Sequence, residues 1–110
     1  IHTRGYASSI ASRMAATLSP KDVKKRMDEI NDNFTEAREE IEAAMEAVGT
    51  TYFNEEAEYA KEVTEKTLGM YYKLCDDMEP EERAATQRSM GMKMEQLKAE
   101  LKQLDHAHDD

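Results

Sequence analysis

The stretch Ser19–Gly49, SPKDVKKRMDEINDNFTEAREEIEAAMEAVG, decides the fold of this 110-residue chain. Its apolar residues recur at alternating steps of four and three: Val23, Met27, Ile30, Phe34, Ala37, Ile41, Ala44 and Val48. Between them, from Lys24 to Glu42, every residue is polar. An apolar repeat of 3.5 residues with charge on the other faces predicts a long α-helix with one narrow seam, which must be buried against other helices.

The ends of this first helix carry recognisable signals. Ser19 can accept a hydrogen bond from the amide of Asp22, and Pro20 stands where a helix needs no amide donor. Asp22 and Arg26 are four residues apart, which predicts an ion pair along the helix. Gly49 can take the left-handed conformation that closes a helix. We therefore expect a helix over about residues 20–48.

Two further helices are expected, over about residues 54–78 and 80–106. Either Thr51 or Asn54 could cap the second helix, and Pro80 marks either a new helix start or a kink in one long helix. The second helix has a broad apolar face, as expected of a helix with two neighbours. Its positions are Phe53, Ala57, Ala60, Val63, Leu68, Tyr71, Leu74 and Met78, and the third seam is Met90, Met94, Leu97, Leu101 and Leu104.

Short breaks between three helices favour antiparallel neighbours. The sequence thus predicts an all-α fold, an elongated antiparallel three-helix bundle or coiled-coil hairpin with a basic N-terminal arm. The arm comprises residues 1–18 and the helical body residues 19–110.

The arm differs sharply from the body in charge. Residues 1–21 contain Arg4, Arg13 and Lys21 and no acid, whereas the remainder has 12 basic against 24 acidic residues. An arm rich in Ser, Ala and Arg, with Ile10, Met14 and Leu18 at four-residue steps, is typical of an organelle-targeting presequence. The run RGYAS at residues 4–8 also resembles a mitochondrial processing site. We expect a mitochondrial location, in the matrix or peripheral to the inner membrane, with a plastid as the alternative.

Composition excludes several classes of function. A formal net charge of −9 argues against nucleic-acid binding through the acidic body, because phosphate contacts need a basic surface. No apolar run approaches the ~20 residues that span a bilayer. One cysteine, Cys75, permits neither an internal disulfide nor a cysteine-rich zinc site.

Residues that could carry chemistry have simpler explanations. His106 and His108 could ligate a transition metal only if something ordered the tail. Met92 points away from Met90 and Met94 on a helix, so the three cannot form one thioether cluster. Cys75 lies beside two acids that discourage its thiolate. The two residues of each adjacent glutamate pair point in different directions, so these pairs are interpreted as solvent-exposed helix surface and not as paired catalysts. We therefore expect no enzyme, no cofactor, no metal site and no small-molecule substrate.

These observations favour a structural role. We expect a non-catalytic accessory subunit of a large mitochondrial assembly, with an inner-membrane respiratory-chain complex or the ATP synthase as first choice of host. The alternative is a helical chaperone, assembly factor or regulatory inhibitor that binds one client protein reversibly. Partners should be protein subunits of a larger complex. The residues expected to contact them are Arg4, Tyr6, Ile10, Arg13, Met14, Tyr59, Met70, Tyr72 and Met92.

Overall fold

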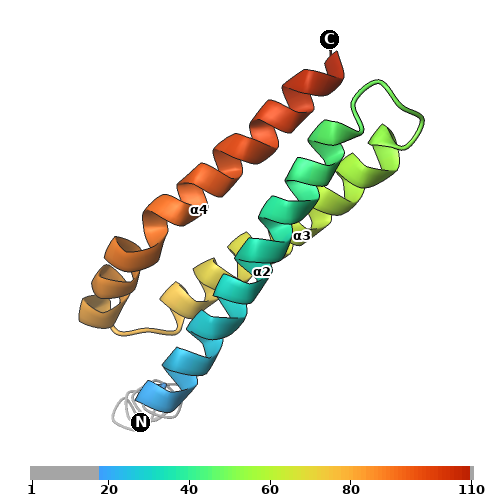
Figure 1. Cartoon of the computed structure of the whole chain (residues 1–110). Helices are drawn as coiled ribbons and strands as arrows, with labels where there is room; N and C mark the ends of the chain where they lie inside the picture. The colour runs from blue at the N-terminus through green and yellow to red at the C-terminus, as the bar shows by residue number, and fades with distance from the viewer. Residues whose placement is uncertain (1–17, 110) are drawn as a thin grey trace, which may run out of the picture.

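The computed structural model describes residues 18–109, with side chains through Ala107, and this part of the chain is an all-α bundle of three helices without strands (Figure 1). Helix α2 spans Pro20–Glu46, α3 spans Phe53–Asp76 and α4 spans Pro80–Asp109. Successive helices run in opposite directions, so the predicted antiparallel three-helix bundle is confirmed.

The predicted start of the first helix is confirmed, and its predicted end is late by two residues. Ser19 Oγ accepts a hydrogen bond from the Asp22 amide at 3.1 Å, with Pro20 in the first turn. Helix α2 stops at Glu46 because a local turn takes over: the Thr50 hydroxyl donates to the Ala47 carbonyl at 2.6 Å. Gly49 follows with a φ of 86°, the left-handed conformation expected of it.

The remaining helix boundaries resolve the alternatives that the sequence left open. Neither Thr51 nor Asn54 caps α3, because Tyr52 occupies the cap position and makes no side-chain cap hydrogen bond. Pro80 begins a new helix, so it marks a turn and not a kink. Helix α4 continues to Asp109, three residues beyond the predicted end.

The predicted ion pair between Asp22 and Arg26 is wrong, because Arg26 reaches a different carboxylate. Its Nη1 donates to Asp77 Oδ2 at 2.9 Å, and both side chains are about 70% covered. This hydrogen bond is the main cause that holds the pKa of Asp77 below its usual range. This partly buried ion pair joins residues that are 51 positions apart, and it ties the start of α2 to the end of α3.

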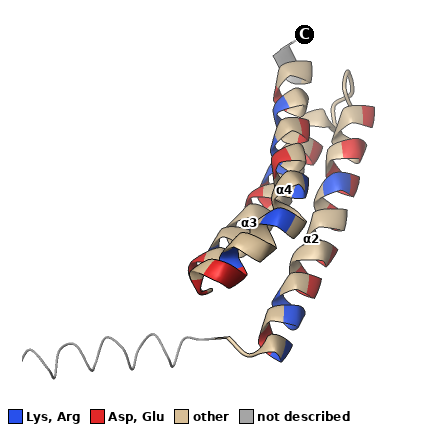
Figure 2. Cartoon of the chain, turned by 90° about the vertical axis from the view of Figure 1, so that its left-hand side faces the viewer, with Lys and Arg blue, Asp and Glu red and all other residues tan. Residues whose placement is uncertain are grey.

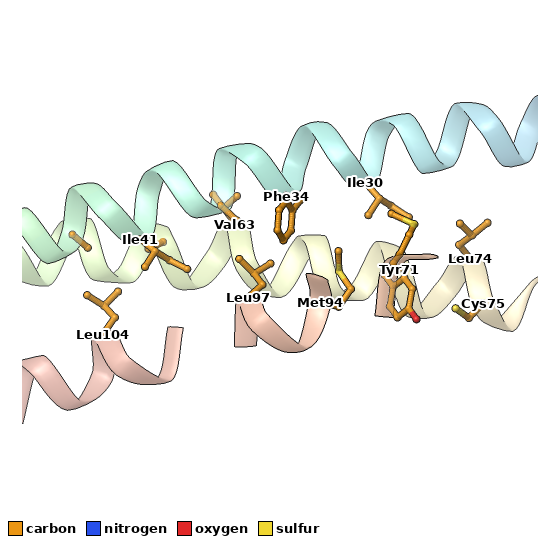
Figure 3. Packing of buried hydrophobic residues seen from close by; sticks show 14 of the residues in the cluster. Ile30, Phe34, Ile41, Val63, Tyr71, Leu74, Cys75, Met94, Leu97 and Leu104 are labelled. Carbon is orange, nitrogen blue, oxygen red and sulfur yellow. The ribbon is translucent and has the colours of Figure 1, made fainter. Parts of the chain in front are cut away.

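The core lies where the three predicted seams meet (Figure 3). Of the eight seam positions predicted for the first helix, five are buried, Val23 and Met27 are half-buried, and Val48, which lies beyond the end of α2, is exposed. The seam of α4 is buried at Met90, Met94, Leu97 and Leu104, with Leu101 half-buried. The narrow seams are therefore covered along the middle of the bundle and less well at the ends of α2.

Helices α2 and α3 make the most extensive contact, and α4 contacts each of them less. Small side chains at buried positions of both helices allow this approach: Ala37 and Ala44 on α2, Ala60 on α3. Polar contacts hold α4 against α2. The Arg38 guanidinium donates two hydrogen bonds to Glu100, at 3.1 and 3.0 Å.

Two threonines continue the seam of α3, and sequence reasoning passed over them because they are polar. One series of buried or half-buried positions in α3 and its following turn steps by four and three: Phe53, Ala57, Ala60, Thr64, Thr67, Tyr71, Leu74 and Met78. Thr64 and Thr67 are fully buried. The Thr67 hydroxyl donates to the Val63 carbonyl at 2.8 Å, whereas the Thr64 hydroxyl has no hydrogen-bond partner.

Replacing Thr64 with valine should therefore stabilise the bundle. A buried hydroxyl without a partner carries a desolvation penalty of about 1–3 kcal/mol, and valine keeps a similar shape and the same β-branching. We expect Thr64→Val to raise the free energy of unfolding by about 1 kcal/mol in urea titrations. The matched control Thr67→Val loses a hydrogen bond and should not stabilise. Equal gains in unfolding free energy from both variants would contradict the view that, of these two hydroxyls, only that of Thr64 lacks a hydrogen-bond partner.

Candidate interaction surface

A groove lies between the second half of α3 and the first half of α4. It has a volume of about 510 Å³ and is open to solvent. Its lining comprises Tyr71, Tyr72, Cys75, Asp76, Arg83, Gln87, Gly91, Met92 and Glu95. The groove forms only because the turn at residues 77–79 folds α4 back along α3.

Two of the residues expected to contact partners lie on this groove, one on each helix. The side chain of Tyr72 is 45% exposed and that of Met92 is 84% exposed. Tyr72 directly follows the buried Tyr71, and Met92 is two positions from each of the buried Met90 and Met94, so both point away from the core. The structure thus brings together two large side chains, 20 positions apart, of which Tyr72 is partly exposed and Met92 largely exposed.

The floor of the groove is buried. Tyr71 and Cys75 are both buried, one turn apart on α3. Burial, and secondly a hydrogen bond with the Cys75 thiol, raise the pKa of Tyr71 to about 12. A Cβ on Gly91 would lie 3.6 Å from the Tyr71 hydroxyl oxygen, an ordinary contact distance. Gly91 therefore leaves the groove open above Tyr71 without being required for close packing.

Arg83 fixes the corner at which the groove begins. Its Nε donates to the Cys75 carbonyl at 2.7 Å, and its Nη2 donates to the Met78 carbonyl at 2.9 Å. These carbonyls lie at and just beyond the end of α3, where helix acceptors lack intrahelical partners. Thr86 on α4 also donates to Met78 Sδ at 3.2 Å. The first turns of α4 are thus held against the end of α3.

The rim of the groove is acidic. The side chain of Asp76 is exposed and makes no hydrogen bond or ion pair with the residues that the structure describes. Glu95 pairs with Lys98 at 2.8 Å, and the Lys98 ammonium stands 5.3 Å from the centre of the Tyr72 ring. The hydrogen bond to Glu95 is the main cause that raises the pKa of Lys98. Acidic residues also gather where α3 leads into α4 (Figure 2).

The other predicted contact residues lie elsewhere. Tyr59 is on the acidic surface between α2 and α3, where its hydroxyl donates to Glu36 at 3.0 Å, and this hydrogen bond is the main cause that raises the Tyr59 pKa. Met70 is half-buried and packs against the core. The remaining predicted residues, Arg4, Tyr6, Ile10, Arg13 and Met14, lie outside the described residues.

Sequence reasoning did not assign Tyr71, Arg83 or Gly91 to this surface. Tyr71 was expected only in the core, and nothing in the sequence linked Arg83 to carbonyls of the preceding helix. The groove is a tertiary feature of two paired helices. The sequence could indicate Tyr72 and Met92 as contact residues only because each is a large side chain at a helix position outside the buried seam.

A second hollow, between α2 and α3, is lined almost wholly by carboxylates. Its residues are Glu40, Glu55, Glu56, Glu58, Tyr59 and Glu62. Burial first, then the charges of Glu56, Glu36 and Glu39, raise the pKa of Glu40. The folded state therefore binds a proton at Glu40 more readily than the unfolded chain.

The raised pKa of Glu40 has a definite consequence for stability against pH. Protonated Glu40 is favoured in the folded state, so Glu40 contributes stability that is fully present below its unfolded pKa. That contribution is lost as pH rises through the pKa of Glu40 in the folded protein. We expect Glu40→Gln to raise Tm at pH 7 and to give a shrinking advantage as pH falls through the carboxylate range. Exposed Glu42→Gln on the same helix is the control. An advantage of Glu40→Gln that persists unchanged at low pH would contradict this account.

Other sequence candidates form no site among the described side chains. Within residues 18–107, no three His, Cys, Asp or Glu side chains gather closely enough to hold a metal ion. His106 is exposed, and the side chain of His108 lies outside the described residues. Met90 and Met94 are core residues, as expected from their seam positions. In the described part of the chain, no helix has the length and apolar character needed to cross a membrane.

The fold and the groove together define a class: an all-α, antiparallel three-helix bundle with a groove between its second and third helices. The chain belongs to the embryogenesis-like protein family, because the model of the embryogenesis-like protein helical domain matches residues 24–106. A curated relative, the Embryogenesis-like protein of Arabidopsis thaliana, is 56% identical over 87 residues. These residues cover 79% of this chain and 49% of the relative, so the chain spans about half of that protein. No solved structure matches.

Proposed function

We propose that this chain is a non-catalytic structural accessory subunit of a large mitochondrial assembly. A respiratory-chain complex of the inner membrane or the ATP synthase is the first choice of host. The contrast between an acid-free, presequence-like segment and an acidic body carries this proposal. The proposed location is the matrix or the periphery of the inner membrane, with a plastid as the alternative.

The groove between α3 and α4 supports a role in protein contact. Exposed tyrosine and methionine side chains over a buried floor are the kind of surface that aromatic and flexible apolar residues supply at interfaces. Tyr72 and Met92 would be buried by a docked host subunit. The acidic body should then meet basic surfaces of neighbouring subunits.

A reversible binding module is the second candidate, and Met92 favours it. A thioether on a flexible, exposed side chain adapts to more than one partner shape. In this case the chain is a helical chaperone, assembly factor or regulatory inhibitor of one client protein.

Affinity purification of the native, tagged chain after detergent solubilisation tests both candidates. One copy per host complex, retained at high salt, is the expected result for a structural subunit. Sub-stoichiometric association released by salt supports the reversible module instead. Fractionation of organelles in the same material tests the location, and recovery of the chain outside mitochondria would remove the basis for choosing a mitochondrial host.

A further inference from the structure

We infer that the groove between α3 and α4 binds an amphipathic segment of a partner protein that carries arginine or lysine beside its apolar residues. This inference rests on the proposed function, because a subunit or binding module needs a docking site. It adds the chemistry of the segment that this site would bind. The groove lies lengthwise between two antiparallel helices, an arrangement that suits a segment laid along it.

The apolar half of the recognition comes from two side chains that the bundle leaves partly or largely exposed. Tyr72 and Met92 flank the groove from opposite helices, and the buried Tyr71 lies at its floor. The Tyr71 and Tyr72 rings are tilted by 56° with their centres 5.5 Å apart, so the tyrosine pair presents a supported aromatic wall. A partner side chain seated here would exclude water from Tyr72 and Met92 together.

The charged half of the recognition is acidic. Asp76 is exposed, lines the groove and has no pairing partner among the described residues. Two basic side chains lie nearby: Arg83 on the lining is turned to two backbone carbonyls, and Lys98 beside Tyr72 is paired with Glu95. Beyond residue 21 the chain carries twice as many acids as bases, so its wider field also attracts basic segments. An acidic segment or a nucleic acid is therefore disfavoured.

Peptide binding to the full 110-residue chain tests the inference. The probe is a fluorescein-labelled synthetic amphipathic peptide of alanine, leucine and arginine, and the control probe has every arginine replaced by glutamate. We expect saturable binding of the arginine peptide alone, measured by fluorescence anisotropy, with affinity that falls as salt rises. Equal binding of both peptides, or binding of neither, would overturn the inference.

Matched variants locate the binding site. The double variant Tyr72→Ser/Met92→Ser should weaken binding of the arginine peptide about tenfold or more, while Met45→Ser, an exposed methionine at the end of α2, should leave it unchanged. Asp76→Lys should weaken the arginine peptide and strengthen the glutamate peptide. Circular dichroism confirms that each variant keeps its helices. Unchanged affinity in the double variant would place the peptide elsewhere.

Two other occupants are distinguished by further measurements. Concentration-dependent self-association by analytical ultracentrifugation, lost in the double variant, would assign the groove to a second copy and overturn the inference. A tenfold gain in peptide affinity on deleting residues 1–17 would assign it to this chain's own arm, with the same consequence. Peptide binding is read on the isolated chain, so its failure is separate from failure to join a mitochondrial assembly.

Discussion

Leu97→Ala should cost about 2–5 kcal/mol of unfolding free energy, because it removes most of a side chain from the middle of the core and leaves a cavity. Leu97 is 0% exposed and lies on the seam of α4 (Figure 3). The corresponding fall in Tm is on the order of 10 °C or more for a domain of this size. Thermal unfolding followed by circular dichroism at 222 nm measures it.

The control for Leu97→Ala is Gln103→Ala on the same helix. Gln103 is exposed and its side chain makes no hydrogen bond with the described residues, so its truncation should change stability by no more than about 0.5 kcal/mol. Similar small effects of both variants would show that α4 is not packed into the core as the structure has it.

Ala37→Leu should destabilise the bundle by overfilling its core, whereas Leu97→Ala destabilises it by leaving a cavity. Ala37 is 0% exposed on α2, the helix that contacts α3 most extensively. Extra carbon atoms in a well-packed core force neighbours away and cost about 1–3 kcal/mol. Because the contact between α2 and α3 is long, displacing the backbones at one point also loosens adjoining layers. Urea titration should give a lower midpoint for this variant.

Ala99→Leu provides the comparison for Ala37→Leu. Ala99 is exposed on α4, where leucine is a good helix former and has no neighbours to displace. We expect a change within about 0.5 kcal/mol. A stabilising effect of Ala37→Leu would mean that space remains beside Ala37 and that α2 and α3 are not closely packed there.

The fold could be predicted because its pattern is local. Alternating steps of four and three fixed the buried side of α2, and Ser19 and Pro80 marked helix starts by chemistry that acts over a few residues. The periodicity could also have found Thr64 and Thr67, which continue the same steps. They were missed because residue polarity was given more weight than position in the repeat.

The groove and the ion pair of Arg26 could not be predicted in the same way. Arg26 had a candidate partner in Asp22 within one turn, yet it pairs with Asp77 across 51 residues. The sequence does not say which of two carboxylates lies nearer until the helices are paired. For the same reason Tyr72 and Met92 could be named as separate contact residues but not as two sides of one groove.

The half-buried start of α2 has a consequence for how the bundle opens. Val23 and Met27 are seam residues that are less buried than the five seam residues from Ile30 to Ala44, and the Arg26–Asp77 ion pair ties this part of α2 to the end of α3. Local unfolding begins where few apolar contacts are lost. Amide hydrogens in the first turns of α2 should therefore exchange with solvent faster than those around Ile41, through partial opening that leaves the corner between α3 and α4 closed by Arg83.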